Sequence, residues 1–245
     1  MKIIESGSID AIITDPPYGT TACKWDSVID FNLMWKQLNR IIKDNGVIVL
    51  FGSEPFSSAL RMSNIKNYKY DWIWEKSMPS GIATSSFMPM KYHENISVFV
   101  NKSKPTFNKI MTERSDIGKA RLKNSGRILN GSKHKSEHIN KNKISGTYSE
   151  YNKTKVNPKT ILKFKSVPNC NGTKQHPTQK PVALMEYLIK TYTNENETVL
   201  DFTMGSGSTG VAAKNLNRSF IGIEQDQKYF STATERIKAV EYKLF

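Results

Sequence analysis

A carboxylate, two prolines and an aromatic ring stand together near the N-terminus, in the sequence Asp15-Pro16-Pro17-Tyr18. They follow the apolar run Ala11–Ile13, so we expect them just past the end of a short buried strand. The Asp15 carboxylate and the Pro16 carbonyl, whose direction Pro17 restricts, can each accept a hydrogen bond, and the Tyr18 ring can stack on a planar group. Two acceptors that hold the N–H groups of an exocyclic amine, such as adenine N6, would localise its lone pair for attack on an electrophile.

A second stretch that can do chemistry is DFTMGSGSTG, residues 201–210. Its glycines allow backbone amides to approach a ligand closely, and the helix expected after them favours negative charge at its start. Glu224 ends the next apolar run, 23 residues after Asp201, where an acid can hold ribose hydroxyls. The chain has no GKS or GKT element, which argues against a P-loop.

Alternating strand-like and helix-like stretches must position these loops. The short apolar runs that predict strands are Ala11–Thr14, Val47–Gly52, Ile96–Val100, Thr198–Phe202 and Phe220–Glu224. The stretches that predict helices are Phe31–Ile42, Pro55–Ile65, Pro181–Thr191, Thr209–Leu216 and Gln227–Val240. The pattern predicts an α/β fold with a doubly wound, mainly parallel sheet, whose ligands sit at the carboxyl ends of the strands.

The formal charge of +14 lies in one internal segment. Residues 101–175 hold 18 Lys and Arg against 4 Asp and Glu, whereas the rest of the 245-residue chain is balanced at 18 each. The segment is rich in Lys, Asn, Ser and Gly, which is typical either of a solvated insertion or of a surface that binds a polyanion. Confinement of the charge to one block favours the polyanion surface.

Composition excludes several other classes of protein. No apolar run approaches the roughly 18 residues of a membrane span, and the N-terminus lacks a signal-peptide pattern. Cys23 and Cys170 stand in unrelated contexts, so we predict neither a disulfide framework nor a metal site, and a cytoplasmic protein. His134 and His138 are four residues apart, but no further ligand accompanies them, and we interpret them as solvated. We expect Trp72 and Trp74 to be core residues, and Met88, Met90 and Met204 to be packing residues.

Four blocks of sequence together resemble the amino-group DNA methyltransferases. Asp15–Tyr18 matches their DPPY motif, and DFTMGSGSTG resembles their S-adenosylmethionine motif. QHPTQKPVALMEYLI and KYHENISVFV resemble two further family blocks. The order, with the catalytic motif first and the cofactor motif last, is that of the permuted β-group.

The resemblance implies a Rossmann-like methyltransferase domain made of residues 1–100 (catalytic half) and 176–245 (cofactor half). Residues 101–175 would be the target-recognition insertion. The implied partner is double-stranded DNA, from which the target base is flipped into the pocket. The implied source is a bacterium or a phage. A homodimer, a cognate restriction endonuclease or an orphan enzyme all remain open.

The resemblance also assigns the site residues. Asp15 and Pro16 would grip the amine, with Pro17 restricting Pro16, and Tyr18 would stack on the flipped base. The cofactor would be surrounded by Asp201, Phe202, Gly205, Ser206, Gly207 and Glu224, and its methionine end by His176, Thr178, Gln179 and Lys180. A strand with a Gly-Asp pair usually precedes the catalytic motif in this family. Its absence here means that either the sequence is truncated or other residues contact the cofactor adenine.

We therefore predict site-specific methylation of adenine N6 in DNA, with S-adenosylmethionine as the methyl donor. This prediction has three alternatives. Cytosine-N4 methylation uses the same chemistry, although Asp at position 15 favours adenine within the family. Protein methylation is typical of enzymes with an NPPY loop and the cofactor motif first, and this chain has neither. The third alternative is a non-catalytic DNA-binding protein with a degenerate methyltransferase core; the missing first strand favours it, and the intact catalytic and cofactor motifs argue against it.

Overall fold

The computed structural model describes residues 1–20, 26–101, 104–124, 154–168 and 174–240. The chain divides into two compact units, one of Met1–Asn108 and Thr160–Phe245, and the other of Lys109–Lys159. None of the helices in the described part of the chain is long and apolar enough to cross a membrane. Cys23, His134, His138 and Cys170 lie outside the described residues.

Nine strands and six α-helices are described, with one short 3-10 turn η1 (Ile82–Thr84). The strands are β1 (Ile9–Thr14), β2 (Ile42–Gly52), β3 (Tyr68–Ser80), β4 (Lys91–Val100), β5 (Thr112–Glu113), β6 (Lys155–Val156), β7 (Ile161–Phe164), β8 (Thr198–Asp201) and β9 (Ser219–Gly222). The helices are α1 (Phe31–Ile41), α2 (Phe56–Ser63), α3 (Asp116–Asn124), α4 (Val182–Tyr192), α5 (Ser208–Asn215) and α6 (Gln227–Lys238).

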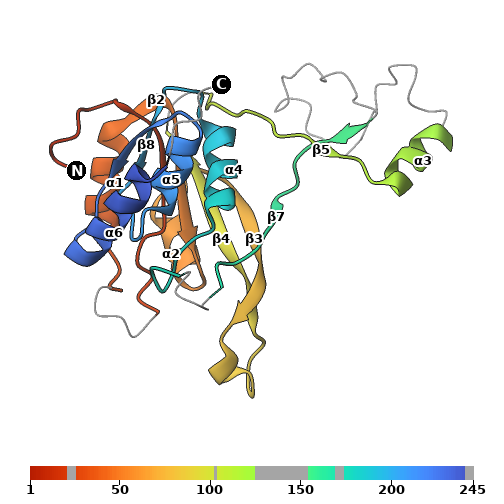
Figure 1. The fold of residues 1–245 in the computed structure, drawn as a ribbon, viewed down its shortest axis with the longest axis horizontal. Coiled ribbons are helices and arrows are strands. Elements are labelled where there is room, and N and C mark those ends of the chain that lie inside the picture. The colour runs from red at the N-terminus through yellow and green to blue at the C-terminus, as the bar shows by residue number, and fades with distance from the viewer. Residues whose placement is uncertain (21–25, 102–103, 125–153, 169–173, 241–245) are drawn as a thin grey trace. The chain divides into compact units, whose positions relative to one another are not determined.

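The larger unit is built on a seven-stranded sheet with the order β7-β3-β4-β2-β1-β8-β9 (Figure 1). Strands β2, β1, β8 and β9 pair in parallel, and β4 pairs antiparallel with both β2 and β3. Strand β7 is parallel to β3, so within this sheet β4 runs against the other six strands. The mainly parallel α/β sheet predicted from the sequence is confirmed.

Helices cover both faces of this sheet, because its central strands are apolar on both sides. On one face α4 and α5 pack over alternate residues such as Ile13, Val49 and Trp72. On the other face α1 and α2 pack over Ile12 and Ile48. Because both faces are buried, the central strands consist of consecutive apolar residues rather than of alternating apolar and polar ones.

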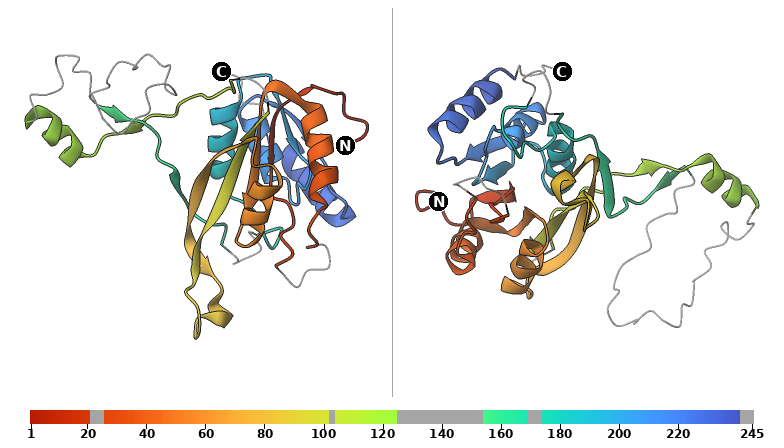
Figure 2. Two further views of the ribbon diagram at one scale, coloured as in Figure 1. Left: turned by 180° about the vertical axis from the view of Figure 1, so that it is seen from behind. Right: turned by 90° about the horizontal axis from the view of Figure 1, so that it is seen from below.

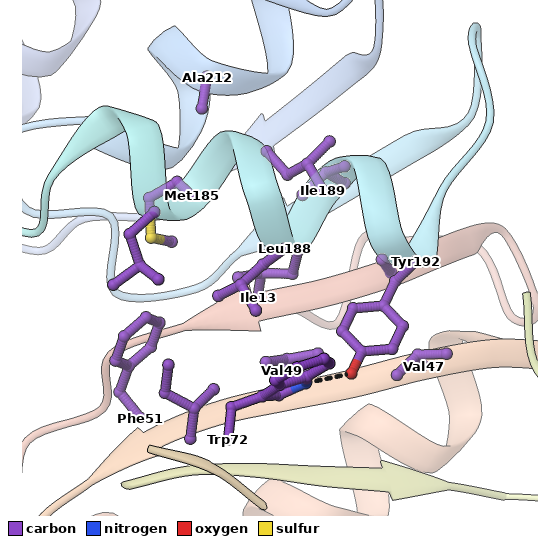
Figure 3. Packing of buried hydrophobic residues seen from close by; sticks show 14 of the residues in the cluster. Ile13, Val47, Val49, Phe51, Trp72, Met185, Leu188, Ile189, Tyr192 and Ala212 are labelled. Atoms are coloured by element: carbon purple, nitrogen blue, oxygen red, sulfur yellow. Dashed lines mark hydrogen bonds between the residues drawn. The ribbon is translucent and has the colours of Figure 1, made fainter. Parts of the chain in front are cut away.

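The packing of α4 is fixed by a polar contact inside the apolar layer (Figure 3). The Trp72 indole Nε1 donates to the hydroxyl of Tyr192, 2.6 Å away, and the Tyr70 hydroxyl lies 2.8 Å from the same oxygen. Trp72 and Trp74 are each 3% exposed, which confirms them as core residues. Met204 is also buried, but Met88 and Met90 are 50% and 40% exposed, so the expectation that these two pack in the interior is wrong.

Residues of the basic segment contribute to both units. In the second unit β5 pairs antiparallel with β6, and α3 follows β5. Strand β7 belongs instead to the main sheet, where Trp74 pairs with Leu162. The compact second unit, residues 109–159, is therefore narrower than the predicted insertion of residues 101–175.

Candidate active site

The two loops singled out in the sequence meet at the carboxyl ends of β1, β8 and β9, around a cavity of about 480 Å³. Such a volume is in the range of small-molecule and cofactor sites. Thirteen of the fourteen predicted site residues line it: Asp15, Pro16, Pro17, Tyr18, His176, Thr178, Gln179, Lys180, Asp201, Phe202, Gly205, Ser206 and Glu224. Gly207 is the exception.

Asp15, which directly follows β1, is the centre of a cluster of charged and polar groups. Its Oδ1 accepts a hydrogen bond from the Tyr18 hydroxyl, and its Oδ2 forms an ion pair with the Lys180 ammonium. Lys180 Nζ also lies 3.2 Å from Glu94 Oε2, and Lys76 Nζ lies 3.4 Å from Glu94 Oε1. The alternating chain Lys76–Glu94–Lys180–Asp15 therefore links the β3–β4 pair to the predicted catalytic carboxylate.

Burial controls the ionisation of this cluster. It raises the pKa of Asp15, and the nearby Lys180 cation only partly offsets that rise. Burial alone would lower the pKa of Lys180, but attraction to Asp15 and Glu94 outweighs it and raises that pKa to about 12. Lys180 therefore stays charged at neutral pH. The Asp15 carboxylate is more basic than a solvated one, which strengthens it as a hydrogen-bond acceptor.

Tyr18 supplies a fixed aromatic wall of the cavity. Its ring packs on Phe56 with centroids 5.1 Å apart and an interplanar angle of 33°. Burial, with the adjacent Asp15 charge, raises the pKa of its hydroxyl well above the ordinary value, so the hydroxyl remains a neutral donor. A planar group that enters the cavity can therefore stack on an uncharged ring.

Two threonines join the catalytic loop to the glycine loop, and a third fixes the glycine loop itself. Thr14 Oγ1 donates to Asp201 Oδ1 (2.6 Å), Thr209 Oγ1 donates to Asp201 Oδ2 (2.6 Å), and Thr203 Oγ1 donates to the Asp15 carbonyl (3.0 Å). Burial raises the pKa of Asp201 to about 6, although the hydroxyl donors Thr14 and Thr209 oppose the rise. Sequence reasoning missed all three threonines as positioning residues. Only their place could have indicated them, since Thr14 directly precedes the catalytic motif and Thr203 and Thr209 lie inside the glycine stretch.

Glu224 and the glycines shape the other side of the cavity. The amide of Gly205 donates to Glu224 Oε2 (2.8 Å), and the amides of Gln225 and Asp226 donate to Oε1. Gly205 has a positive φ of 51°, which favours glycine. Gly207, with φ 78°, instead serves packing, because a Cβ there would stand 2.9 Å from the Ala233 Cβ in α6.

The segment before α4 completes the lining. The His176 ring packs edge-on against Tyr229, with centroids 4.2 Å apart, and its Nδ1 lies 3.1 Å from the Thr178 hydroxyl. Burial lowers the pKa of His176, so the imidazole is neutral at pH 7. Lys180, predicted to lie near the methionine end of a cofactor, places its ammonium on Asp15 and Glu94.

Comparison with known proteins agrees with this geometry. The profile of the DNA methylase family matches residues 9–235. The chain belongs to the DNA methylase family. It is 30% identical to the type II methyltransferase M.HpaI of Haemophilus parainfluenzae, over 97% of this chain and 70% of that protein. It is 29% identical to the type II methyltransferase M1.MboII of Moraxella bovis, over 97% of this chain and 92% of that one.

A solved structure of another methylase has the same fold. The complex of M1.HpyAVI with S-adenosylmethionine aligns with a TM-score of 0.59 and 28% identity, over 94% of this chain and 89% of that chain. The resemblance to DNA methyltransferases inferred from the four sequence blocks is thus confirmed, as is the Rossmann-like fold.

Proposed function

We propose that this DNA methylase transfers a methyl group from S-adenosylmethionine to the N6 amino group of adenine in duplex DNA. The observation that carries the proposal is that one cavity holds both Asp15–Tyr18 and the Gly205–Glu224 pair. A cavity that binds both the target amine and the methyl donor can bring the two into contact. Asp rather than Ser at position 15 favours adenine over cytosine.

The described residues fit S-adenosylmethionine. Glu224 keeps a carboxylate at the cavity wall, oriented by three backbone amides, and can accept hydroxyl groups of a ribose. Gly205 has no side chain to keep a ligand away from the backbone. Asp201 and Phe202 line the same cavity. When bound, the cofactor supplies an electrophilic methyl group on a sulfonium. We propose that His176, Thr178 and Gln179 lie at its methionine end.

On the amine side, each residue of the catalytic loop has a separate role. The Asp15 carboxylate accepts one N–H of the adenine amino group, and the Pro16 carbonyl accepts the other. Each carboxylate oxygen can accept more than one hydrogen bond, so Asp15 can take the substrate while it keeps Tyr18 and Lys180. Its raised pKa favours uptake of the proton that the amine loses after methyl transfer.

Base flipping delivers the amine to this loop, because N6 of a paired adenine cannot reach a cavity inside the protein. The Tyr18 ring, held by Phe56, stacks on the flipped base. We propose that the basic segment, residues 101–175, supplies phosphate contacts and target recognition. The described lysines of the second unit, such as Lys109, Lys119, Lys155 and Lys159, are solvent-exposed. Release of counterions from DNA then drives association.

Nucleoside analysis of treated DNA tests the proposal. Duplex DNA incubated with the protein and S-adenosylmethionine is digested and separated, and N6-methyladenine is expected. N4-methylcytosine without N6-methyladenine would establish the cytosine alternative. No methylated base, with no saturable heat on titration with S-adenosylmethionine, would contradict catalysis altogether. Single-molecule sequencing of DNA from an expressing host identifies the modified base and the target sequence together.

A further inference from the structure

The β3–β4 hairpin extends beyond the rest of the sheet, and its tip is apolar and exposed. Figures 1 and 2 show it projecting from the larger unit, with η1 at its end. Phe87 and Ile82 are 74% and 71% exposed. The exposed apolar side chains between residues 78 and 92 are Met78, Ile82, Phe87, Met88, Met90 and Tyr92. We call these six residues the hairpin patch.

The direction of the strands puts this hairpin on the same edge of the sheet as the catalytic cavity. Strand β3 runs parallel to β1 and β8, because both β3 and β2 are antiparallel to β4. The end of β3 therefore projects past the edge at which Asp15 follows β1 and Asp201 ends β8. A base that enters the cavity must approach across this edge.

The root of the hairpin is tied to the catalytic carboxylate. Lys76 on β3 and Glu94 on β4 form the outer half of the ion-pair chain that ends at Lys180 and Asp15. From Lys76 to Ser80 the strand advances by roughly 13 Å at about 3.3 Å per residue, and η1 follows. The grooves of B-DNA are about 7.5 to 8.5 Å deep, so the hairpin is long enough to reach into a duplex that delivers a base to Asp15.

The chemistry of the hairpin fits a polyanion with an apolar interior. Residues 77–93 contain no Asp or Glu, and they contain Lys91 and His93 together with five Ser and Thr residues. Such a surface meets phosphates without repulsion. Phe, Ile and Met are the side chains that act as wedges between base steps.

We propose that the hairpin patch is a DNA-contacting wedge, whose apolar side chains insert into the base stack beside the target and stabilise the flipped state. The inference rests on the proposed duplex-DNA substrate and adds a second recognition element to the basic segment. Extrusion of a base exposes apolar faces of its neighbours to water, and Phe87 and Met88 cover those faces. The function explains why large apolar side chains remain exposed on this edge.

The test compares Phe87→Ala/Met88→Ala with the control Met62→Ala/Leu33→Ala, which removes similarly exposed apolar side chains from α2 and α1. The probe is a duplex that contains the target sequence identified by single-molecule sequencing, with 2-aminopurine in place of the target adenine. The hairpin variant should bind it about 5- to 150-fold more weakly, as expected for the loss of base stacking, and should lose the fluorescence increase on flipping. Binding of S-adenosylmethionine should be unchanged in both variants.

Equal DNA binding and equal fluorescence in the two variants, with a wild-type protein that methylates DNA, would overturn the wedge and leave the proposed function standing. Failure of the wild-type protein to methylate any DNA would instead overturn the proposed function. Sedimentation velocity tests whether a second copy of the chain, rather than DNA, covers the hairpin patch. If the hairpin variant converts a dimer into a monomer while its DNA binding is retained, a second copy of the chain covers the patch and the wedge is wrong.

Discussion

Replacing Lys180 by Met should slow methyl transfer at neutral pH, through Asp15 rather than through the cofactor. Lys180 Nζ lies 3.2 Å from Glu94 Oε2 and is in direct contact with Asp15. At an effective dielectric constant of about 20, two unit charges 3.2 Å apart attract by about 5 kcal/mol. Met retains most of the volume but leaves two buried carboxylates without their shared cation.

Loss of that cation raises the pKa of Asp15 further, because burial and the Glu94 charge both disfavour its carboxylate. A protonated Asp15 is a donor where the amine requires an acceptor. Losing one charge-assisted hydrogen bond costs about 1.5 to 3 kcal/mol, so we expect single-turnover methyl transfer to slow roughly 10- to 150-fold at neutral pH. The rate should recover as the pH rises, since alkaline pH restores the carboxylate.

The assay is single-turnover transfer of labelled methyl groups across the neutral and alkaline range, with calorimetry for the cofactor. An uncompensated buried charge destabilises a protein by about 3 to 5 kcal/mol, so the melting temperature of each variant is measured alongside its transfer rate. The double variant Lys180→Met/Asp15→Asn should melt at a higher temperature than Lys180→Met alone. A wild-type rate and pH profile in Lys180→Met would refute this reasoning. Weaker cofactor binding with an unchanged transfer rate would assign Lys180 to the cofactor instead.

The same geometry supports four further predictions. Asp15→Ala should abolish most turnover while cofactor binding persists, and Asp15→Asn, which keeps a carbonyl acceptor, should retain more; equal turnover in Asp15→Ala and wild type would contradict the clamp. Tyr18→Ala should be severe and Tyr18→Phe mild in the same assay, because stacking needs the ring. The pKa of Asp201 is about 6 in the folded protein against an ordinary 3.8, so the folded state releases this proton at a higher pH than the unfolded state does. The free energy of unfolding should therefore fall by about 3 kcal/mol as the pH rises from about 4 to about 6. Denaturant unfolding should show this fall in the wild type and not in Asp201→Asn. The logarithm of the DNA-binding constant falls linearly with the logarithm of the salt concentration. Replacing lysines of residues 109–159 by Gln should make this slope shallower by about 0.9 for each phosphate that is no longer neutralised, whereas Lys36→Gln in α1 should leave it unchanged.

The sequence by itself determined the fold class and the two loops that make the site. The five runs predicted as strands and the five predicted helices are all present, because their apolar periods are local properties of the chain. Their ends shifted by several residues, as where β2 begins at Ile42 and β9 ends at Gly222. Asp15, Glu224 and the glycines could be identified because each sits in a short motif directly after an apolar run.

Only the tertiary structure decided which groups act on those motif residues. Lys180 meets Asp15 across 165 positions of sequence, and Thr203 reaches the Asp15 carbonyl across 188. Strand β7 joined the main sheet beside β3 although its residues lie within the basic segment. Met88 and Met90 remained exposed because the hairpin runs past the helices that cover the sheet. Such pairings depend on how distant elements pack, and composition and spacing record only what is near along the chain.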